Sequence, residues 1–81
     1  MESSTVEVHL FAAARAAVGH SSVEAPAGLV REILDALEAQ HPAFAQVRPR
    51  CSVLVDGLSA SPDTRVQPGS RLDVLPPFAG G

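Results

Sequence analysis

The sequence has no lysine, no tryptophan and no tyrosine, and it has a single cysteine, Cys51. Without lysine there is no residue for Schiff-base chemistry and no phosphate-binding loop of the P-loop type. One cysteine allows neither an internal disulfide nor a cysteine-based zinc or iron–sulfur site. The cationic side chains are therefore all arginines, six in number. These absences exclude several classes of enzyme and metalloprotein.

Charge and hydropathy narrow the function further. The formal net charge is −3 and the cations are not clustered, which argues against nucleic acid as a partner because duplex binding needs clustered cations that displace counterions. No stretch approaches the roughly 18 apolar residues that span a bilayer, so we expect no membrane partner. Residues 1–4 form a short polar tail without the features of a secretory signal, and the expected location is the cytoplasm. The 81 residues suffice for one domain, 1–81.

Alternating hydrophobicity predicts strands near both ends of the chain. In residues 5–11, every second residue is apolar and faces inward (Val6, Val8, Leu10), while Glu7, His9 and Phe11 face outward. Residues 71–75 alternate in the same way, with Leu72 and Val74 inward. Weaker strand signals cover residues 21–25, 51–55 and 63–66, with turns expected at Asp56-Gly57 and Pro68-Gly69. Half-buried strands of this kind belong to a sheet with one apolar face.

Two helices are expected between these strands. Residues 12–18 are rich in alanine, the best helix former, and Gly19 suits the left-handed position that ends a helix. Residues 27–40 carry apolar side chains at a spacing of about 3.6 residues, and Pro42 ends that pattern. Phe44 and Val47 are expected to pack against the core from a loop or short turn.

The order of these elements predicts an α+β fold of the β-grasp type. The first and last strands are the longest and alternate most strongly, so we place them side by side at the centre of a mixed sheet of four or five strands. The helix at residues 27–40 then crosses one face of that sheet. Residues 76–81 contain two prolines and two glycines, which favours an extended C-terminal arm.

Residues that could carry chemistry of their own are few. His9, His20 and His41 do not share metal-ligand spacing, and exposed histidines without a role are common. Cys51 opens an apolar strand, where a thiol packs as a small hydrophobe. No serine lies in a G-x-S-x-G elbow. We therefore expect no independent active site, no metal site and no bound cofactor.

A docking surface is expected instead. The alternation that buries Val74 turns Leu75 outward, and it turns Phe11 outward beside it if the two strands are neighbours. Phe78 in the arm adds a third apolar group. A cluster of exposed apolar side chains indicates an interaction site. The alternative is that Phe11 packs beneath the short helix.

The terminal Gly80-Gly81 is the most informative feature. Glycines have no side chains, so an extended arm that ends in them can enter a narrow channel and bring its carboxylate to a buried site. Residues 75–81 reach roughly 23 Å when fully extended. A carboxylate is a poor electrophile, so a partner enzyme would first convert it into an acyl-adenylate with ATP. The chain would then be a carried substrate.

The sequence resembles the small sulfur-carrier subunit of molybdopterin synthase. The resemblance covers roughly residues 5–81. It rests on Val8-His9-Leu10-Phe11-Ala12-Ala13-Ala14-Arg15-Ala16-Ala17-Val18-Gly19, on the helix ending Gln40-His41-Pro42, and on Leu75-Pro76-Pro77-Phe78-Ala79-Gly80-Gly81. The Pro-Pro-x-x-Gly-Gly ending is fairly specific for this branch, whereas Gly-Gly alone is shared with thiamine sulfur carriers and ubiquitin-like modifiers.

This resemblance implies a ubiquitin-like β-grasp fold and a set of partners. An adenylating and sulfur-transferring enzyme would activate Gly81 with ATP, and Gly80 would accompany it into the active site. The arm would then enter the large subunit of molybdopterin synthase, which binds cyclic pyranopterin monophosphate, in a heterotetramer. The implied partner-binding residues are Phe11, Leu75, Pro76, Pro77, Phe78 and Ala79.

Three other functions remain open at this stage. The chain could carry sulfur for another pathway, such as the synthesis of cysteine, thiamine or a thio-sugar, with the same tail chemistry. It could be a protein modifier that is joined through Gly81 to lysines of its targets. It could also be a non-covalent β-grasp adaptor in which Gly80 and Gly81 have no role.

Overall fold

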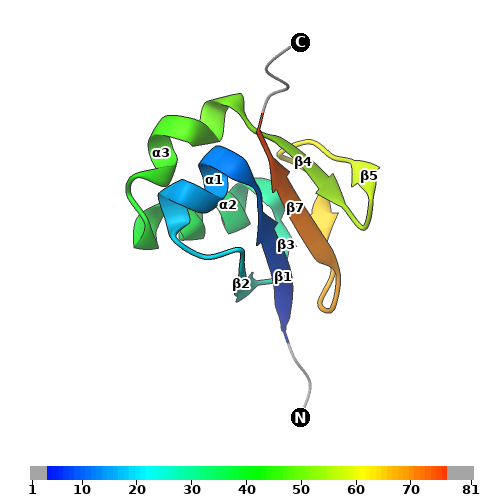
Figure 1. The fold of residues 1–81 in the computed structure, drawn as a ribbon. Coiled ribbons are helices and arrows are strands. Elements are labelled where there is room, and N and C mark those ends of the chain that lie inside the picture. The colour runs from blue at the N-terminus through cyan, green and yellow to red at the C-terminus, as the bar shows by residue number, and fades with distance from the viewer. Residues whose placement is uncertain (1–3, 77–81) are drawn as a thin grey trace.

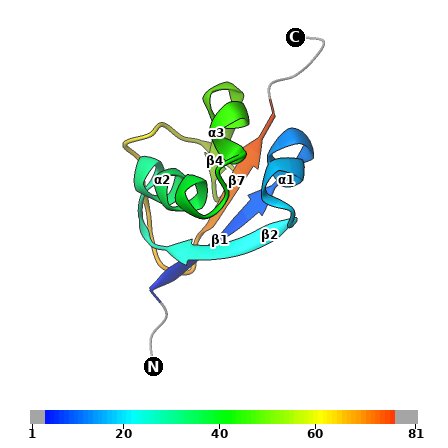
Figure 2. The ribbon, with the colours of Figure 1, turned by 90° about the vertical axis from the view of Figure 1, so that its left-hand side faces the viewer.

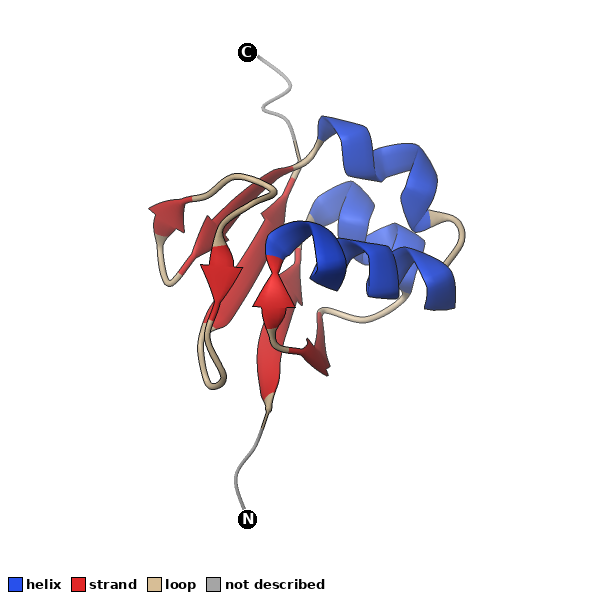
Figure 3. Cartoon of the chain, turned by 180° about the vertical axis from the view of Figure 1, so that it is seen from behind, coloured by secondary structure: helices blue, strands red, loops and turns tan. Residues whose placement is uncertain are grey.

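The computed structural model describes residues 4–76 and confirms the α+β β-grasp fold (Figure 1). Its main sheet has five strands in the order β2-β1-β7-β4-β5. The helices lie together on one face of this sheet, as Figures 2 and 3 show from two further sides. A two-layer arrangement of this kind buries one apolar sheet face beneath apolar helix faces.

The centre of the sheet is a parallel pair, β1 (Thr5–Leu10) and β7 (Arg71–Leu75). β2 (Ser22–Pro26) pairs with β1 and β4 (Ser52–Val55) pairs with β7, both antiparallel. β5 (Leu58–Ser59) continues the sheet beyond β4. The central position expected for the first and last strands is therefore confirmed.

The core consists of the inward residues of β1 and β7 together with the helices. Its fully buried members on these two strands are those that the alternation predicts (Val6, Val8, Leu10, Leu72 and Val74), each at most 1% exposed. Full burial of a single side chain of this size stabilises the fold by about 1.5–3 kcal/mol. The two strands thus supply the apolar floor on which the helices pack.

Three α-helices and a 3₁₀ turn cover this floor: α1 (Ala12–Val18), α2 (Val30–Gln40), α3 (Phe44–Val47) and η1 (Arg48–Arg50). α1 ends as expected at Gly19, whose φ is 87° and whose N–H donates to the Arg15 carbonyl. Phe44 is completely buried, and it lies in a short helix rather than a loop. Within residues 4–76, no helix is long and apolar enough to cross a membrane.

The start of the long helix differs from the prediction. α2 begins at Val30, not at residue 27, because Gly28 and Leu29 form a two-residue strand, β3, that pairs with β6 (Arg65–Val66). Gly28 has a φ of 155°, and a Cβ there would lie 2.7 Å from Glu32 Oε1. That oxygen accepts a hydrogen bond of 2.9 Å from the Leu29 N–H and so caps the helix.

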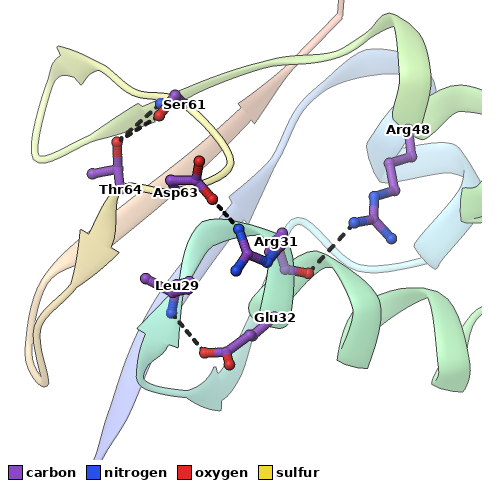
Figure 4. A network of polar contacts seen from close by, with 7 residues as sticks. All are labelled: Leu29, Arg31, Glu32, Arg48, Ser61, Asp63 and Thr64. Carbon is purple, nitrogen blue, oxygen red and sulfur yellow. Dashed lines mark hydrogen bonds and ion pairs between the residues drawn. The ribbon is translucent and has the colours of Figure 1, made fainter.

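Polar contacts fix α2 to the segments around it (Figure 4). Arg31 forms an ion pair with Asp63, in the loop that leads into β6. Arg48 Nη1 lies 2.8 Å from Asp35 Oδ1 and 3.0 Å from Glu38 Oε1, and Arg48 Nη2 donates to the Arg31 carbonyl at 3.4 Å. Arg48 therefore ties η1 to two turns of α2.

Replacement of Leu34 by alanine tests the packing of α2. Leu34 is 8% exposed and faces the core, so Leu34→Ala should lower the free energy of unfolding by about 2–5 kcal/mol through lost burial and a residual cavity. Urea denaturation measures this loss. Gln40→Ala, at an exposed position of the same helix, is the control and should change stability by no more than about 0.5 kcal/mol. An unchanged midpoint for Leu34→Ala would contradict the packing.

Candidate functional site

The parallel pairing of β1 and β7 brings Phe11 next to Leu75. Leu10 and Val74 are register partners, and each is followed by one of these two residues. The Phe11 N–H donates to the Val74 carbonyl at 3.2 Å, so the backbones remain joined at this point. Because parallel strands end at the same edge of a sheet, the chain leaves β7 beside the corner between β1 and α1. This edge is the candidate functional site.

The exposure of the side chains at this edge agrees only in part with the prediction that both Phe11 and Leu75 face solvent. Phe11 is 38% exposed, which rules out the alternative that it packs beneath α1 as a core residue. Leu75 was expected to be exposed and is half-buried, as is Pro76. Leu75 loses exposure because it lies on a central strand between β1 and β4, opposite Ser52. The apolar side chains at the chain's exit are thus a mixture of exposed and partly covered groups.

A sharp corner holds Phe11 in place. Ala12 follows it with a φ of 51°, a left-handed conformation that costs a non-glycine residue roughly 1–2 kcal/mol. Phe11 itself is extended, and its carbonyl accepts the N–H groups of Ala14 and Arg15 in the first turn of α1. The corner therefore turns the chain from the sheet into the helix and leaves the Phe11 side chain at the bend.

The outer face of the sheet, which is the face turned away from the helices, extends the site. The register aligns His9 with Asp73 and Asp73 with Leu54, so these three side chains share that face. Leu54 is half-buried, and it was not among the site residues predicted from the sequence. The alternation along β4 could have indicated it, because the neighbouring Val53 is buried and Leu54 therefore faces outward. The outer face thus adds an apolar residue close to Leu75.

The hairpin between β4 and β5 is fixed to β7 by Asp56. Asp56 and Gly57 have φ angles of 49° and 86°, and they form the expected two-residue turn. Asp56 Oδ1 accepts the Arg71 N–H at 2.9 Å. This bond is the main cause of the lowered pKa of the Asp56 carboxyl, and a hydrogen bond from the Ser70 side chain lowers it further. The turn presents Leu58, which is 73% exposed, at the end of the hairpin.

The residues considered for independent chemistry do not assemble. Within residues 4–76, no three His, Cys, Asp or Glu side chains are grouped so that they could hold a metal ion. His9 Nε2 lies 3.0 Å from Glu7 Oε1 on the outer face. The Cys51 thiol is half-buried and donates to the Val47 carbonyl at 3.3 Å, and burial raises its pKa. These features favour the protonated form of the Cys51 thiol and a structural role for the residue.

A groove of about 590 Å³ lies between α2, η1 and the segment that follows β4. Val30, Leu34 and Val53 are among the apolar residues that line it. The charged residues that line it, Arg31, Glu38 and Arg48, all take part in ion pairs, as Figure 4 shows for Arg31. The groove thus lacks a free charge that would orient a substrate.

The remaining residues proposed from the sequence lie outside the described part of the chain. These are Pro77, Phe78, Ala79, Gly80 and Gly81. Of the expected arm, 76–81, the structure describes Pro76, which follows β7 without strand structure.

A family model and several solved structures each match nearly the whole chain. A model of the ThiS family matches residues 8–81. SAMP1, the small archaeal modifier protein 1 from Haloferax volcanii, is 28% identical with a TM-score of 0.82, over 95% of this chain and 99% of that chain. A chain of the BexX/CysO complex from Amycolatopsis orientalis is 28% identical with a TM-score of 0.79, over 94% and 99%.

A third solved structure is the putative molybdopterin converting factor subunit 1 from Pyrococcus furiosus. It is 25% identical with a TM-score of 0.81, over 94% of this chain and 100% of that chain. A search among curated proteins finds no significant match.

Replacement of Phe11 by arginine tests whether the corner is surface or core. Because Phe11 is 38% exposed, Phe11→Arg should change the free energy of unfolding by no more than about 1 kcal/mol. Leu10→Ala, at the neighbouring buried position, should lose about 2–5 kcal/mol. Thermal denaturation compares the two variants. A loss for Phe11→Arg as large as that for Leu10→Ala would make Phe11 a core residue.

Stability at low pH tests the role of Asp56. Its lowered pKa means that ionised Asp56 stabilises the fold; this contribution is complete above the ordinary value of 3.8 and disappears as the pH falls through the lowered pKa. Asp56→Ala should therefore have a lower Tm than the wild type at neutral pH, and the gap should narrow in acid. Glu24→Ala, at an exposed residue of β2, is the control. A gap that is independent of pH would contradict the account.

Proposed function

The chain belongs to the ThiS family of small β-grasp sulfur carriers, and we propose that it serves as the sulfur-carrier subunit of a molybdopterin synthase. In this role Gly81 is the C-terminal residue, and its carboxyl group is converted into a thiocarboxylate. The sulfur then passes to cyclic pyranopterin monophosphate during synthesis of the molybdenum cofactor.

The observation that carries this proposal is the place where the chain leaves the sheet. Leu75 ends the central strand β7 near the exposed Phe11, Pro76 follows it, and the sequence continues as Pro-Phe-Ala-Gly-Gly. A rigid sheet edge with apolar side chains can bind a partner while a side-chain-free ending enters that partner's active site. The Pro-Pro-x-x-Gly-Gly ending favours molybdopterin synthesis, and the similarity to the Pyrococcus furiosus protein is consistent with it.

The chemistry requires two partner enzymes. In the first, the Gly81 carboxylate attacks the α-phosphorus of ATP, pyrophosphate leaves, and an acyl-adenylate forms. A hydrosulfide ion then attacks the carbonyl carbon and displaces AMP, which gives the thiocarboxylate directly. If the nucleophile is instead an enzyme persulfide, an acyl disulfide forms, and a second thiol cleaves its S–S bond to give the thiocarboxylate and a disulfide. In the second, the thiocarboxylate sulfur is transferred to the pterin precursor, and hydrolysis restores the carboxylate.

The partners follow from this sequence of steps. The first is an adenylating and sulfur-transferring enzyme that binds ATP, so the chain itself needs no cofactor. The second is the large subunit of molybdopterin synthase, with which the chain would form a heterotetramer of two large and two small subunits. Phe11, Leu75 and Pro76 would contact both partners at different times. We expect these reactions to take place in the cytoplasm.

Two alternative functions are supported by specific similarities. The BexX/CysO complex, whose matched chain is 28% identical, favours a sulfur carrier for another pathway. SAMP1, also 28% identical, favours a protein modifier that is joined to other proteins. Both alternatives use an activated C-terminal glycine, and they differ from the main proposal in the nucleophile that receives the acyl group or the sulfur.

Deletion of Gly80 and Gly81 tests the proposed function in a reconstituted synthase. The chain, activated and loaded with sulfur, is combined with the large subunit from the same organism and cyclic pyranopterin monophosphate. Formation of molybdopterin is then measured. The full chain should give product and the deletion variant none, because the variant lacks the glycine that carries the sulfur.

The deletion variant must also fold, and its Tm should equal that of the full chain because the buried core, from Val6 to Val74, is unchanged. Glu24→Ala, at an exposed residue of β2, keeps the whole C-terminal segment, so it is the control and should remain active. Product from the deletion variant would contradict a carrier role and would favour the adaptor. If the sulfur-loaded full chain gives no product with the large subunit, the molybdopterin proposal is contradicted and a sulfur carrier for another pathway is favoured.

A further inference from the structure

Arginine supplies every cationic side chain of the protein. The six are Arg15, Arg31, Arg48, Arg50, Arg65 and Arg71, and lysine is absent from all 81 positions. Lysine is among the commonest residues of globular proteins. A mixture of lysine and arginine is therefore the ordinary expectation. Packing would explain the absence of lysine if each guanidinium made contacts that an ammonium group cannot make.

Packing explains arginine at one position. Arg48 forms contacts through both terminal nitrogens of its guanidinium. Nη1 contacts the carboxylates of Asp35 and Glu38, and Nη2 donates to the Arg31 carbonyl. A lysine ammonium is a compact charge on a flexible stem and does not reproduce such a fork.

The other five arginines make no such use of the fork. Arg31 forms one contact with Asp63, and Arg71 Nε forms one contact, of 2.6 Å, with Asp73. Arg15, Arg50 and Arg65 are exposed and form no ion pair within residues 4–76. A lysine could supply the same charge at each of these positions, so neither stability nor net charge accounts for the choice.

The chemical difference between the two side chains does account for it. A lysine amine loses its proton readily enough to act as a nucleophile, whereas a guanidinium stays protonated in proteins. At the same pH, the deprotonated fraction of a lysine is on the order of 10²–10³ times that of an arginine. An activated acyl group at the C-terminus of one copy would therefore acylate a lysine on another copy, and it would leave an arginine untouched.

We propose, on the basis of the carrier or modifier function above, that the absence of lysine makes the side chains of this protein inert as amide-forming acceptors of its own activated C-terminus. The acyl group of Gly81 then passes to sulfur donors or to amines of other proteins. Copies of this chain are not joined to one another through side chains. Where the protein modifies another protein, no further unit is joined to a side chain of the first.

The reaction that is prevented is simple aminolysis. The amine nitrogen of one copy would attack the Gly81 carbonyl carbon of another, and a C–N amide bond would form. The bond from that carbon to the leaving group, AMP or a thiol, would break, and the nitrogen would release a proton to solvent. Cys51 is not an alternative acceptor, because its thiol is half-buried and hydrogen-bonded to the Val47 carbonyl. The remaining nitrogen nucleophiles are the α-amine at the start of the chain and the imidazoles of His9, His20 and His41, and an acyl-imidazole hydrolyses without leaving a lasting link.

Lysine variants at exposed positions test the proposal without either partner enzyme. The full chain is prepared with a C-terminal thioester at Gly81 by intein cleavage, and its competence is first established by formation of an amide with added Nα-acetyl-lysine. The wild type, Arg65→Lys and Arg65→Gln are then incubated at equal, millimolar concentration and mildly alkaline pH. Denaturing gels and peptide mass spectrometry measure covalent dimers and locate the linkage. Thermal denaturation confirms that all three proteins are folded.

Arg65→Lys should form at least about tenfold more dimer than the wild type, with the amide at residue 65. The wild type and Arg65→Gln should give only hydrolysed monomer and, at most, linkage to the α-amine. Side-chain-linked dimers of the wild type, or equal dimer yields from Arg65→Lys and Arg65→Gln, would overturn the proposal. Because the thioester is supplied by synthesis, these outcomes are separate from failure of the reconstituted synthase, which would bear on the proposed function alone.

Discussion

The parallel pairing of β1 and β7 is the interaction on which the rest of the structure depends. It joins two segments from opposite ends of the sequence, and it buries Val8 and Leu10 against Leu72 and Val74 at the centre of the sheet. Parallel strands end at the same edge, so the last residues of β7 emerge beside the first residue after β1. The exit of the C-terminal segment is thus held by the most deeply buried part of the molecule. A tail attached to a peripheral strand would lack this fixed starting point.

Sequence patterns predicted the elements that bury one face and whose pattern can be recognised from neighbouring residues alone. Val6, Val8 and Leu10 alternate with polar residues, so the face of β1 could be assigned without knowing its neighbours. The start of α2 could not be assigned in this way. Residues 28–29 continue the apolar pattern of the helix, but they pair with β6, more than thirty residues later, and that pairing is invisible in a local window. Long-range contacts of this kind override local periodicity.

The candidate site shows the same division. The outward position of Phe11 was predictable because it continues the alternation of β1, and its exposure confirms it. Leu75 continues the alternation of β7 equally well, but it is half-buried since strands on both sides cover it. Leu54 joins the same face through its register with Asp73, which only the sheet reveals. The chemistry assigned to Gly80 and Gly81 rests on their place in the sequence and lies outside the described residues. The position of the sheet edge therefore follows from the packing of the described residues, whereas the role of the ending is a hypothesis from the sequence.

The central claim is that Gly81 carries sulfur, and the mass of the intact protein tests it most directly. The chain is purified from its native host without reducing agents, its intact mass is measured, and its C-terminal peptide is sequenced. The account predicts a species heavier by one exchange of oxygen for sulfur, located at Gly81 and sensitive to alkylation. A preparation that contains only the carboxylate, and that gains neither sulfur nor an adduct after incubation with ATP and host extract, would contradict it.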